Sequence, residues 1–255
     1  MNTDINVKYP WIPFYEAVAD KLLERKSRKK RENLNQAMAD IANSVGVGKK
    51  LFVIENRDVP SNPSLILDDI SPFTVFFFMS YSISDIKRRQ IISEIADFLN
   101  ISKSITLPNS FEGLPTIIAR SDGEPLRMNY RDAHWHDQED EHLYKDKIWR
   151  LFELSLKYAD GVLIDSKELK KLYMDITSNK LGGMLTTGLY CVRPQKYLMT
   201  NSKIVKYINE QFGLPLSTKM NADDYFSAID AIGNKLKSSQ FGLASNVDIV
   251  VNSGK

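Results

Sequence analysis

The residues best suited to chemistry lie in one stretch, residues 184–198, where a strand-like run ends in charged and aromatic side chains. Residues 186–192 are rich in β-branched and aromatic types, a composition typical of a half-buried strand. Pro194 would end that strand because proline has no N–H to donate. The side chains that follow are Arg193, Lys196 and Tyr197. Two cations and a ring past a sheet edge suit a phosphate and a base, and the alternative is an ordinary strand end with solvated charges.

The densest positive charge lies in residues 25–31, which hold six cations in seven residues. One interpretation is a solvated helix end, because basic residues complement the dipole at a helix C-terminus. The other is a grip on a phosphate backbone, since six cations exceed what a dipole needs. The phosphate contacts predicted here are Lys26, Arg28, Lys29, Lys30 and Arg31. Arg88 and Arg89 join them, because cations in the first turn of a predicted helix oppose its dipole and suggest another use.

Residues 120–142 form a long segment without clear periodicity, and long segments of this kind in compact domains are usually functional or disordered. Interleaved cations and aromatic rings in it could stack on unpaired bases. These residues are Arg127, Tyr130, Arg131 and Trp135. The same segment holds His134, His136 and His142 among carboxylates. A metal site is the less favoured interpretation, because no zinc spacing is present, and a solvated acidic loop is preferred.

Two further motifs resemble sites of phosphate chemistry. Residues 46–50, Gly-Val-Gly-Lys-Lys, resemble a phosphate loop only superficially, since the glycine spacing is wrong and position 50 is lysine rather than serine or threonine. We expect a helix C-cap there. A nuclease site needs strand carboxylates and a nearby lysine. Asp165, Glu168 and Lys170 could serve, although their spacing does not match that pattern. We therefore predict no catalytic residue, no metal site and no cofactor for this chain.

Hydrophobic periodicity predicts a helix-rich α+β fold. Apolar positions at helical spacing predict helices from Phe14, over 34–45, 86–99, 146–159, 166–174, 202–212 and 222–238. Ser71 and Pro72 are expected to start a short helix that is apolar on all sides and therefore buried. A small mixed or antiparallel sheet is predicted from residues 51–54, 115–119 and 185–192.

Composition bounds the class of protein. With 255 residues, 43% of them hydrophobic, the chain can bury a sizeable core. The net charge is only +2, so any affinity for nucleic acid must come from local clusters of charge. The single cysteine, Cys191, argues for a reducing compartment. The chain starts without a signal-like segment, and its longest apolar run, residues 75–79, is too short to cross a bilayer. We expect a soluble cytoplasmic protein with no membrane partner.

Five motifs in a fixed order give the chain a family resemblance. They are Tyr-Pro-Trp-Ile-Pro-Phe-Tyr at 9–15, Asp-Ile-Ser-Pro-Phe-Thr-Val-Phe at 69–76, Phe-Glu-Gly-Leu-Pro at 111–115, Ile-Trp-Arg-Leu-Phe at 148–152 continuing to Tyr-Ala-Asp at 158–160, and Gly-Leu-Tyr-Cys-Val-Arg-Pro-Gln-Lys-Tyr-Leu at 188–198. Together they resemble the region that precedes the motor in McrB-type proteins, the AAA+ GTPase subunits of modification-dependent restriction systems. The resemblance covers about residues 9–215.

The resemblance implies a DNA-recognition module for phage defence, whose target DNA is expected to carry a modified base. GTP and magnesium would serve an AAA+ motor, and a McrC-like nuclease subunit would be the partner reached through that motor. No Walker A or Walker B motif occurs in the chain, so the motor is expected elsewhere. Residues 1–240 would form the recognition domain, with a split near residue 110 left open, and 241–255 a linker towards the motor.

The resemblance assigns no base-reading residue. Stacking candidates therefore rest on residue type alone, and they are Tyr130, Trp135, Tyr190 and Tyr197. Two other functions stay open at this point. One is a metal-dependent nuclease or other hydrolase, and the other is a protein-interaction domain that docks the motor or nuclease subunit through exposed aromatic residues.

Overall fold

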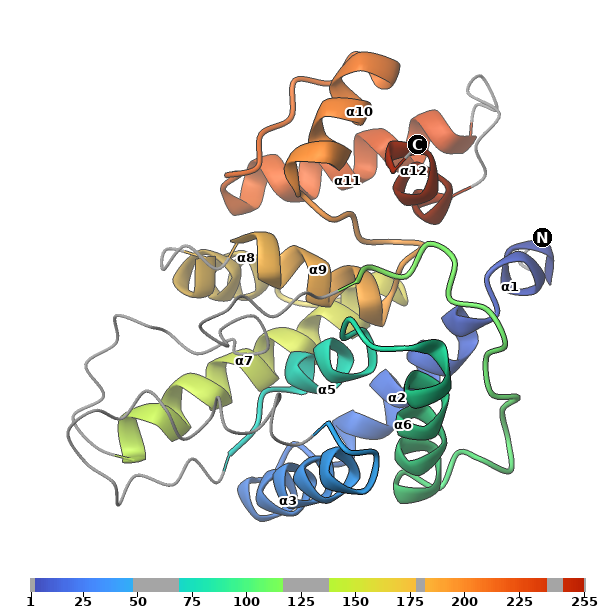
Figure 1. The fold of residues 1–255 in the computed structure, drawn as a ribbon. Helices are drawn as coiled ribbons and strands as arrows, with labels where there is room; N and C mark the ends of the chain where they lie inside the picture. Colours follow the sequence, from blue (N-terminus) through green and yellow to red (C-terminus); the bar gives the residue numbers. More distant parts are fainter. Residues whose placement is uncertain (1–2, 48–68, 117–137, 178–181, 238–244, 255) are drawn as a thin grey trace. The chain divides into compact units, whose positions relative to one another are not determined.

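The computed structural model describes residues 3–47, 69–116, 138–177, 182–237 and 245–254 (Figure 1). The chain divides into two compact units. Unit 1 comprises Met1–Glu16, Asn109–Pro115 and Leu151–Lys255, and unit 2 comprises Ala17–Pro108 and Thr116–Arg150. Both units are discontinuous in sequence, whereas the split that the sequence left open is a single cut near residue 110.

The predicted α+β fold is wrong, because the regular elements of the described residues are helices and none is a β-strand. Residues 185–192, expected to be a strand, lie in helix α9, Gly182–Val192. Their β-branched and aromatic composition misled the prediction, because strand propensity is weak when tertiary packing buries a segment on most sides. Residues 115 and 116 are not in a strand. Residues 51–54 and 117–119 lie outside the described residues.

Unit 2 is built from helices, one of which is short and strongly apolar. They are the later part of α2 (Trp11–Leu23), α3 (Arg28–Ser44), α5 (Pro72–Met79), α6 (Asp85–Phe98) and the first part of α7 (Gln138–Ala159). Every residue of α5 is buried, as the sequence predicts. Ser71 caps α5 by accepting a hydrogen bond from the Phe73 N–H, and Pro72 occupies its first turn. Ser84 is the N-cap of α6 and accepts a hydrogen bond from the Lys87 N–H (3.4 Å).

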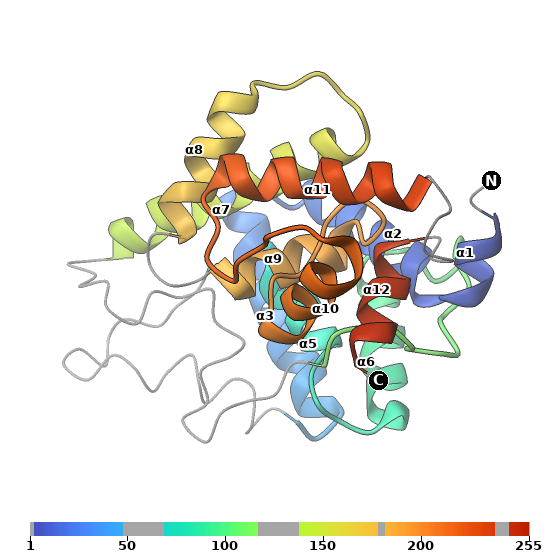
Figure 2. The ribbon, with the colours of Figure 1, turned by 90° about the horizontal axis from the view of Figure 1, so that it is seen from above.

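Unit 1 contains the remaining helices. They are α1 (Thr3–Lys8), the start of α2, the end of α7, α8 (Ser166–Ile176), α9, α10 (Ser202–Phe212), α11 (Ala222–Lys237) and α12 (Asn246–Ser253). α12 packs against α10 (Figure 2). The 109–115 segment is fixed to α2 and α9, because Trp11 Nε1 donates to the Glu112 carbonyl (2.8 Å) and Tyr190 Oη to the Gly113 carbonyl (2.9 Å).

Two segments are more ordered than composition suggested. α7 begins at Gln138 rather than near Asp146, so the end of the 120–142 segment is helical. Residues 246–253, expected within a linker, form α12 and bury Val247, Asp248 and Ile249. Polar residues led to the linker interpretation because their cap and ion-pair roles are visible only in the folded chain. In the described part of the chain, no helix is both long and apolar enough to span a membrane.

Candidate nucleic-acid interface

The turn between α2 and α3 exposes a cluster of cations in unit 2. The first turn of α3 contains no acidic residue, and its N-cap Ser27 makes no side-chain capping hydrogen bond. Four cations at this turn are exposed to solvent, and we call them the cationic turn: Lys26, Arg28, Lys29 and Lys30. Because a helix N-terminus is itself partly positive, this end of α3 attracts anions more strongly than the charges alone would.

Contacts within the cationic turn spread its side chains rather than gather them. Lys30 Nζ donates to the Glu24 carbonyl (2.8 Å), back towards α2. Arg28 Nε lies 4.0 Å from Glu32 Oε1, further along α3. The Glu24 carboxylate is engaged by Lys21 (2.7 Å), whose hydrogen bond is the main reason that its pKa is lowered. Such exposed ion pairs are weak and yield readily to a competing anion.

Arg31, the last cation of the same run, points inward and is only 2% exposed. Its Nη2 lies 2.9 Å from Asp69 Oδ2, whose side chain is fully buried, and its Nη1 pairs with Asp146 on α7. A phosphate cannot reach a guanidinium in this position. The structure therefore separates Arg31 from the four exposed cations and gives it a different role from the one predicted.

The cations at the start of α6 are separated from the cationic turn. Arg88 is buried, donating to Asp85 Oδ1 (2.9 Å) and to the Tyr81 carbonyl (3.0 Å). Arg89 is exposed. Lys87 Nζ contacts the Gly46 carbonyl (3.5 Å), beyond the end of α3.

The other end of α6 lies near the start of α3, because Arg25 donates to the Phe98 carbonyl (3.2 Å) and packs its guanidinium over the Phe98 ring. The two helices are therefore antiparallel. Arg89, at the start of α6, lies at the opposite end of α3 from the cationic turn.

The stretch that ends α9 in unit 1 is internal. Arg193 is 8% exposed and holds Asp160 with two hydrogen bonds, of 2.8 and 3.0 Å. Lys196, partly exposed, pairs with Asp230 (3.1 Å) and lies over the Tyr158 ring. These cations tie the end of α9 to α7 and α11. They do not form the phosphate site that we expected at a strand end.

The two tyrosines expected to stack on bases in this stretch are also buried. Tyr190 and Tyr197 have no exposed surface. Tyr190 donates to the Gly113 carbonyl and Tyr197 to the Ser155 carbonyl (2.6 Å). Burial raises the pKa of both hydroxyls. Neither ring can stack on a base in this conformation, because both faces are covered.

Some predicted site residues lie outside the described residues: Arg127, Tyr130, Arg131, Trp135, His134 and His136. The side chain of His142 is also outside them. Among the side chains that the structure does describe, no cluster of histidine, cysteine and carboxylate is suited to a metal ion. Asp165, a candidate metal ligand in the nuclease hypothesis, is the N-cap of α8, and its side chain accepts hydrogen bonds from the Lys167 and Glu168 N–H groups.

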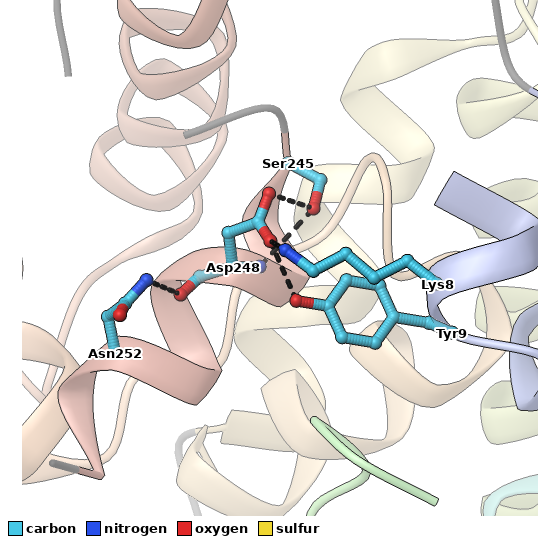
Figure 3. Close-up of polar contacts among 5 residues, drawn as sticks. All are labelled: Lys8, Tyr9, Ser245, Asp248 and Asn252. Carbon is cyan, nitrogen blue, oxygen red and sulfur yellow. Dashed lines mark hydrogen bonds and ion pairs between the residues drawn. The ribbon is translucent and has the colours of Figure 1, made fainter. Parts of the chain in front are cut away.

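A buried carboxylate in unit 1 was not singled out from the sequence. Asp248 on α12 accepts hydrogen bonds from Lys8 Nζ (2.6 Å), Tyr9 Oη (2.7 Å) and Ser245 Oγ (3.1 Å), as Figure 3 shows. Asn252 donates to the Asp248 carbonyl (2.8 Å). The hydrogen bond to Asp248 raises the pKa of Lys8. For Tyr9, burial is the larger cause and its own hydrogen bond to Asp248 the next, and together they raise the pKa to about 12. The cluster joins α1 to α12, which is a structural task.

A sequence signal for this cluster exists. Ser245 and Asp248 have the spacing of a capping box, and an apolar run accompanies them. The structure confirms that Ser245 caps α12 by accepting from the Asp248 N–H (3.2 Å). The pattern predicts the start of a helix, although it does not predict that Lys8 and Tyr9 would meet it.

Comparison with known proteins yields one family. A family model described as "Domain of unknown function (DUF8425)" matches residues 11–248. Neither the curated proteins nor the solved structures provide a match.

Proposed function

Because the chain belongs to the DUF8425 family, whose description carries no activity, we propose a function from the site itself: binding of a nucleic-acid backbone by the cationic turn of unit 2. The observation that carries the proposal is the exposure of Lys26, Arg28, Lys29 and Lys30 at a helix start whose first turn contains no acidic residue. Cations of this kind bind phosphates by releasing counterions from the nucleic acid.

The target we propose is DNA, on the resemblance of five ordered motifs to McrB-type recognition regions. In that proposal the chain is the specificity module of a modification-dependent restriction system, and the DNA carries a modified base. The motor that uses GTP and magnesium and the McrC-like nuclease are separate parts of the system. Base reading is proposed for Arg127, Tyr130, Arg131 and Trp135, which lie outside the described residues.

The number of contacts sets the expected salt dependence. Four phosphate contacts at about −0.9 each give a slope of about −3.6 for the logarithm of the association constant against the logarithm of salt concentration. The affinity should therefore fall about 100-fold between about 50 and 200 mM salt. An interface made by apolar and aromatic side chains would show little of this dependence.

Fluorescence anisotropy of the full chain with a short labelled duplex tests the proposal. Duplexes would be unmodified or carry methylcytosine, hydroxymethylcytosine or methyladenine. The test variant replaces all four cations of the turn with glutamine. The control replaces four exposed lysines of unit 1, namely Lys167, Lys171, Lys203 and Lys206, so that the net charge changes equally.

We expect the test variant to lose most of the affinity and most of the salt slope, while the control keeps both. Equal losses in the two variants would mean that net charge alone attracts DNA, and the cationic turn would not be the site. A preference for one modified duplex would support the restriction-module proposal. The absence of binding to every duplex would refute the nucleic-acid proposal and favour a protein-docking role.

A further inference from the structure

Resting on the proposed phosphate contacts, we propose that Arg31 is the positioning residue of the cationic turn. It touches no phosphate itself and fixes the backbone from which the exposed cations extend. The proposal concerns unit 2 alone, since every residue in it belongs to that unit.

The guanidinium of Arg31 is held from two segments of the chain. Asp69, which precedes α5, pairs with Nη2 at 2.9 Å, and Asp146 on α7 pairs with Nη1. A guanidinium suits this arrangement because its planar fork can engage two carboxylates with a fixed geometry, whereas an ammonium is a point charge on a flexible stem. Both Arg31 and Asp69 are buried, so the pair is shielded from salt.

The same guanidinium reaches the turn that carries the exposed cations. Arg31 Nη1 donates to the Lys26 backbone carbonyl (3.4 Å). The Arg31 N–H also bonds to the Ser27 carbonyl (3.0 Å), closing the first turn of α3. The Ser27 side chain makes no capping hydrogen bond, so the usual cap does not fix the start of α3. The buried Arg31 guanidinium fixes this turn instead, through its bond to the Lys26 carbonyl. The exposed cations therefore extend from a backbone tied to a buried ion network.

A fixed turn binds a phosphate backbone more tightly than a mobile one, because less conformational freedom is lost on binding. Loosening the turn should lower affinity by about tenfold without changing the number of phosphates contacted. The salt slope depends on that number, so it should stay constant. A lost phosphate contact would instead reduce the magnitude of the slope by about 0.9. Affinity and slope together distinguish positioning from contact.

The main test is the double variant Arg31→Met/Asp69→Leu. It removes one positive and one negative charge, so the net charge of the chain is unchanged. Replacing a buried ion pair by apolar side chains of roughly similar size is often neutral for stability, so we expect the variant to fold. Arg31→Lys is the second variant, because it keeps the charge and loses the fork. The control is Ser44→Ala, which removes the hydrogen bonds from Ser44 Oγ to the Glu94 carboxylate (2.7 and 2.9 Å) at the opposite end of α3.

Each variant would be confirmed as folded by circular dichroism at low temperature and titrated with duplex at several salt concentrations. We expect about tenfold weaker binding with an unchanged slope for both Arg31 variants, and unchanged binding for Ser44→Ala. Wild-type affinity in both folded Arg31 variants would overturn the inference. A salt slope whose magnitude is reduced by about 0.9 would also overturn the inference, because Arg31 would then be a phosphate contact and not a positioning residue. Failure of the four-glutamine variant to lose binding would refute the proposed function instead.

Discussion

Replacing Tyr9 with phenylalanine should destabilise unit 1 by about 2 kcal/mol, because it removes one buried hydrogen bond to a charged acceptor. Tyr9 has no exposed surface, and its hydroxyl donates to Asp248 Oδ1 at 2.7 Å (Figure 3). Hydrogen bonds to charged groups contribute about 1.5–3 kcal/mol. Phenylalanine keeps the ring and its packing. The carboxylate keeps Lys8 and Ser245, so it is not left buried without a partner.

The neighbouring Lys8 should matter less, although its bond to Asp248 is shorter, at 2.6 Å. The Lys8 side chain is 58% exposed, so water and salt screen its charge. Lys8→Met is therefore expected to cost under about 1 kcal/mol, despite the raised pKa of Lys8. A double-mutant cycle between Tyr9→Phe and Asp248→Asn should give a coupling energy of about 1–2 kcal/mol. The cycle isolates the Tyr9–Asp248 bond from the loss of the charge itself.

Urea unfolding of the full chain, followed by circular dichroism and tryptophan fluorescence, measures these costs. Two probes are needed because the chain has two units, and transitions that differ between the probes would show that the units unfold separately. The midpoint should fall with an unchanged slope against denaturant. If Tyr9→Phe left the unfolding midpoint unchanged by both probes, or if Lys8→Met cost as much, the reasoning from burial would be refuted.

Three further predictions concern single features. Gly113→Ala should cost about 2–4 kcal/mol in thermal or urea unfolding, because φ is +76° and a Cβ would lie 2.6 Å from Val247 Cγ1; an unchanged midpoint would contradict that clash. Arg31→Met alone should cost about 3–5 kcal/mol, because it removes the ion-pair partner of the buried Asp69 carboxylate, and adding Asp69→Leu should recover much of the loss. Alkaline pH should weaken the fold, since the pKa of Tyr9 is raised to about 12 and the neutral hydroxyl is the form that the folded state holds. The stabilisation from the Tyr9 hydroxyl should thus be unchanged below about pH 9 and be lost as pH rises from about 10 towards 12. The tyrosinate absorbance of Tyr9, measured as the difference between the wild type and Tyr9→Phe, should appear together with unfolding; its appearance in a folded chain would contradict the prediction.

Helices with local end signals could be predicted from the sequence. α10 spans Ser202–Phe212, the range that its apolar spacing predicts. Asn201 caps its start by accepting from the Ile204 N–H, and Gly213 ends it with φ of 62°. The start of α5 was equally readable from Ser71 and Pro72. In both cases neighbouring residues in the chain determine the boundary, so the sequence carries the information.

α9 could not be predicted in the same way, because its environment decides its conformation. The helix buries most of its surface, so its apolar residues show neither the alternation of a strand nor the stripe of a surface helix. Thr186 and Thr187 both donate their hydroxyls to the Gly183 carbonyl (3.2 and 2.8 Å), which satisfies polar groups that a strand would use differently. With residues 185–192 counted as a strand, Arg193 and Tyr197 were expected at a sheet edge, whereas the structure buries both of them just beyond the end of a helix.

The roles of the cations could have been separated further by helical phase. Successive helical residues are rotated by about 100°, so a cation three or four positions before an apolar residue shares its face. Arg31 precedes the buried Leu34 by three, and Arg88 precedes the buried Ile91 and Ile92 by three and four. Both arginines are buried, and each is bound to a carboxylate.

The same phase places Lys29 on the opposite side of α3, because it is rotated by about 160° from Arg31. Lys29 is exposed, in agreement with that position. The cations of a basic run at a helix start therefore do not all have the same role. Arg31 and Arg88 hold their helices in place, and a guanidinium suits that task because its planar fork bonds a carboxylate with fixed geometry. Phase does not decide every cation, because Lys30 lies four positions before the buried Leu34 and is nevertheless exposed, with its ammonium on the Glu24 carbonyl. Lys29 is exposed and out of phase, so it is the phosphate contact to test first.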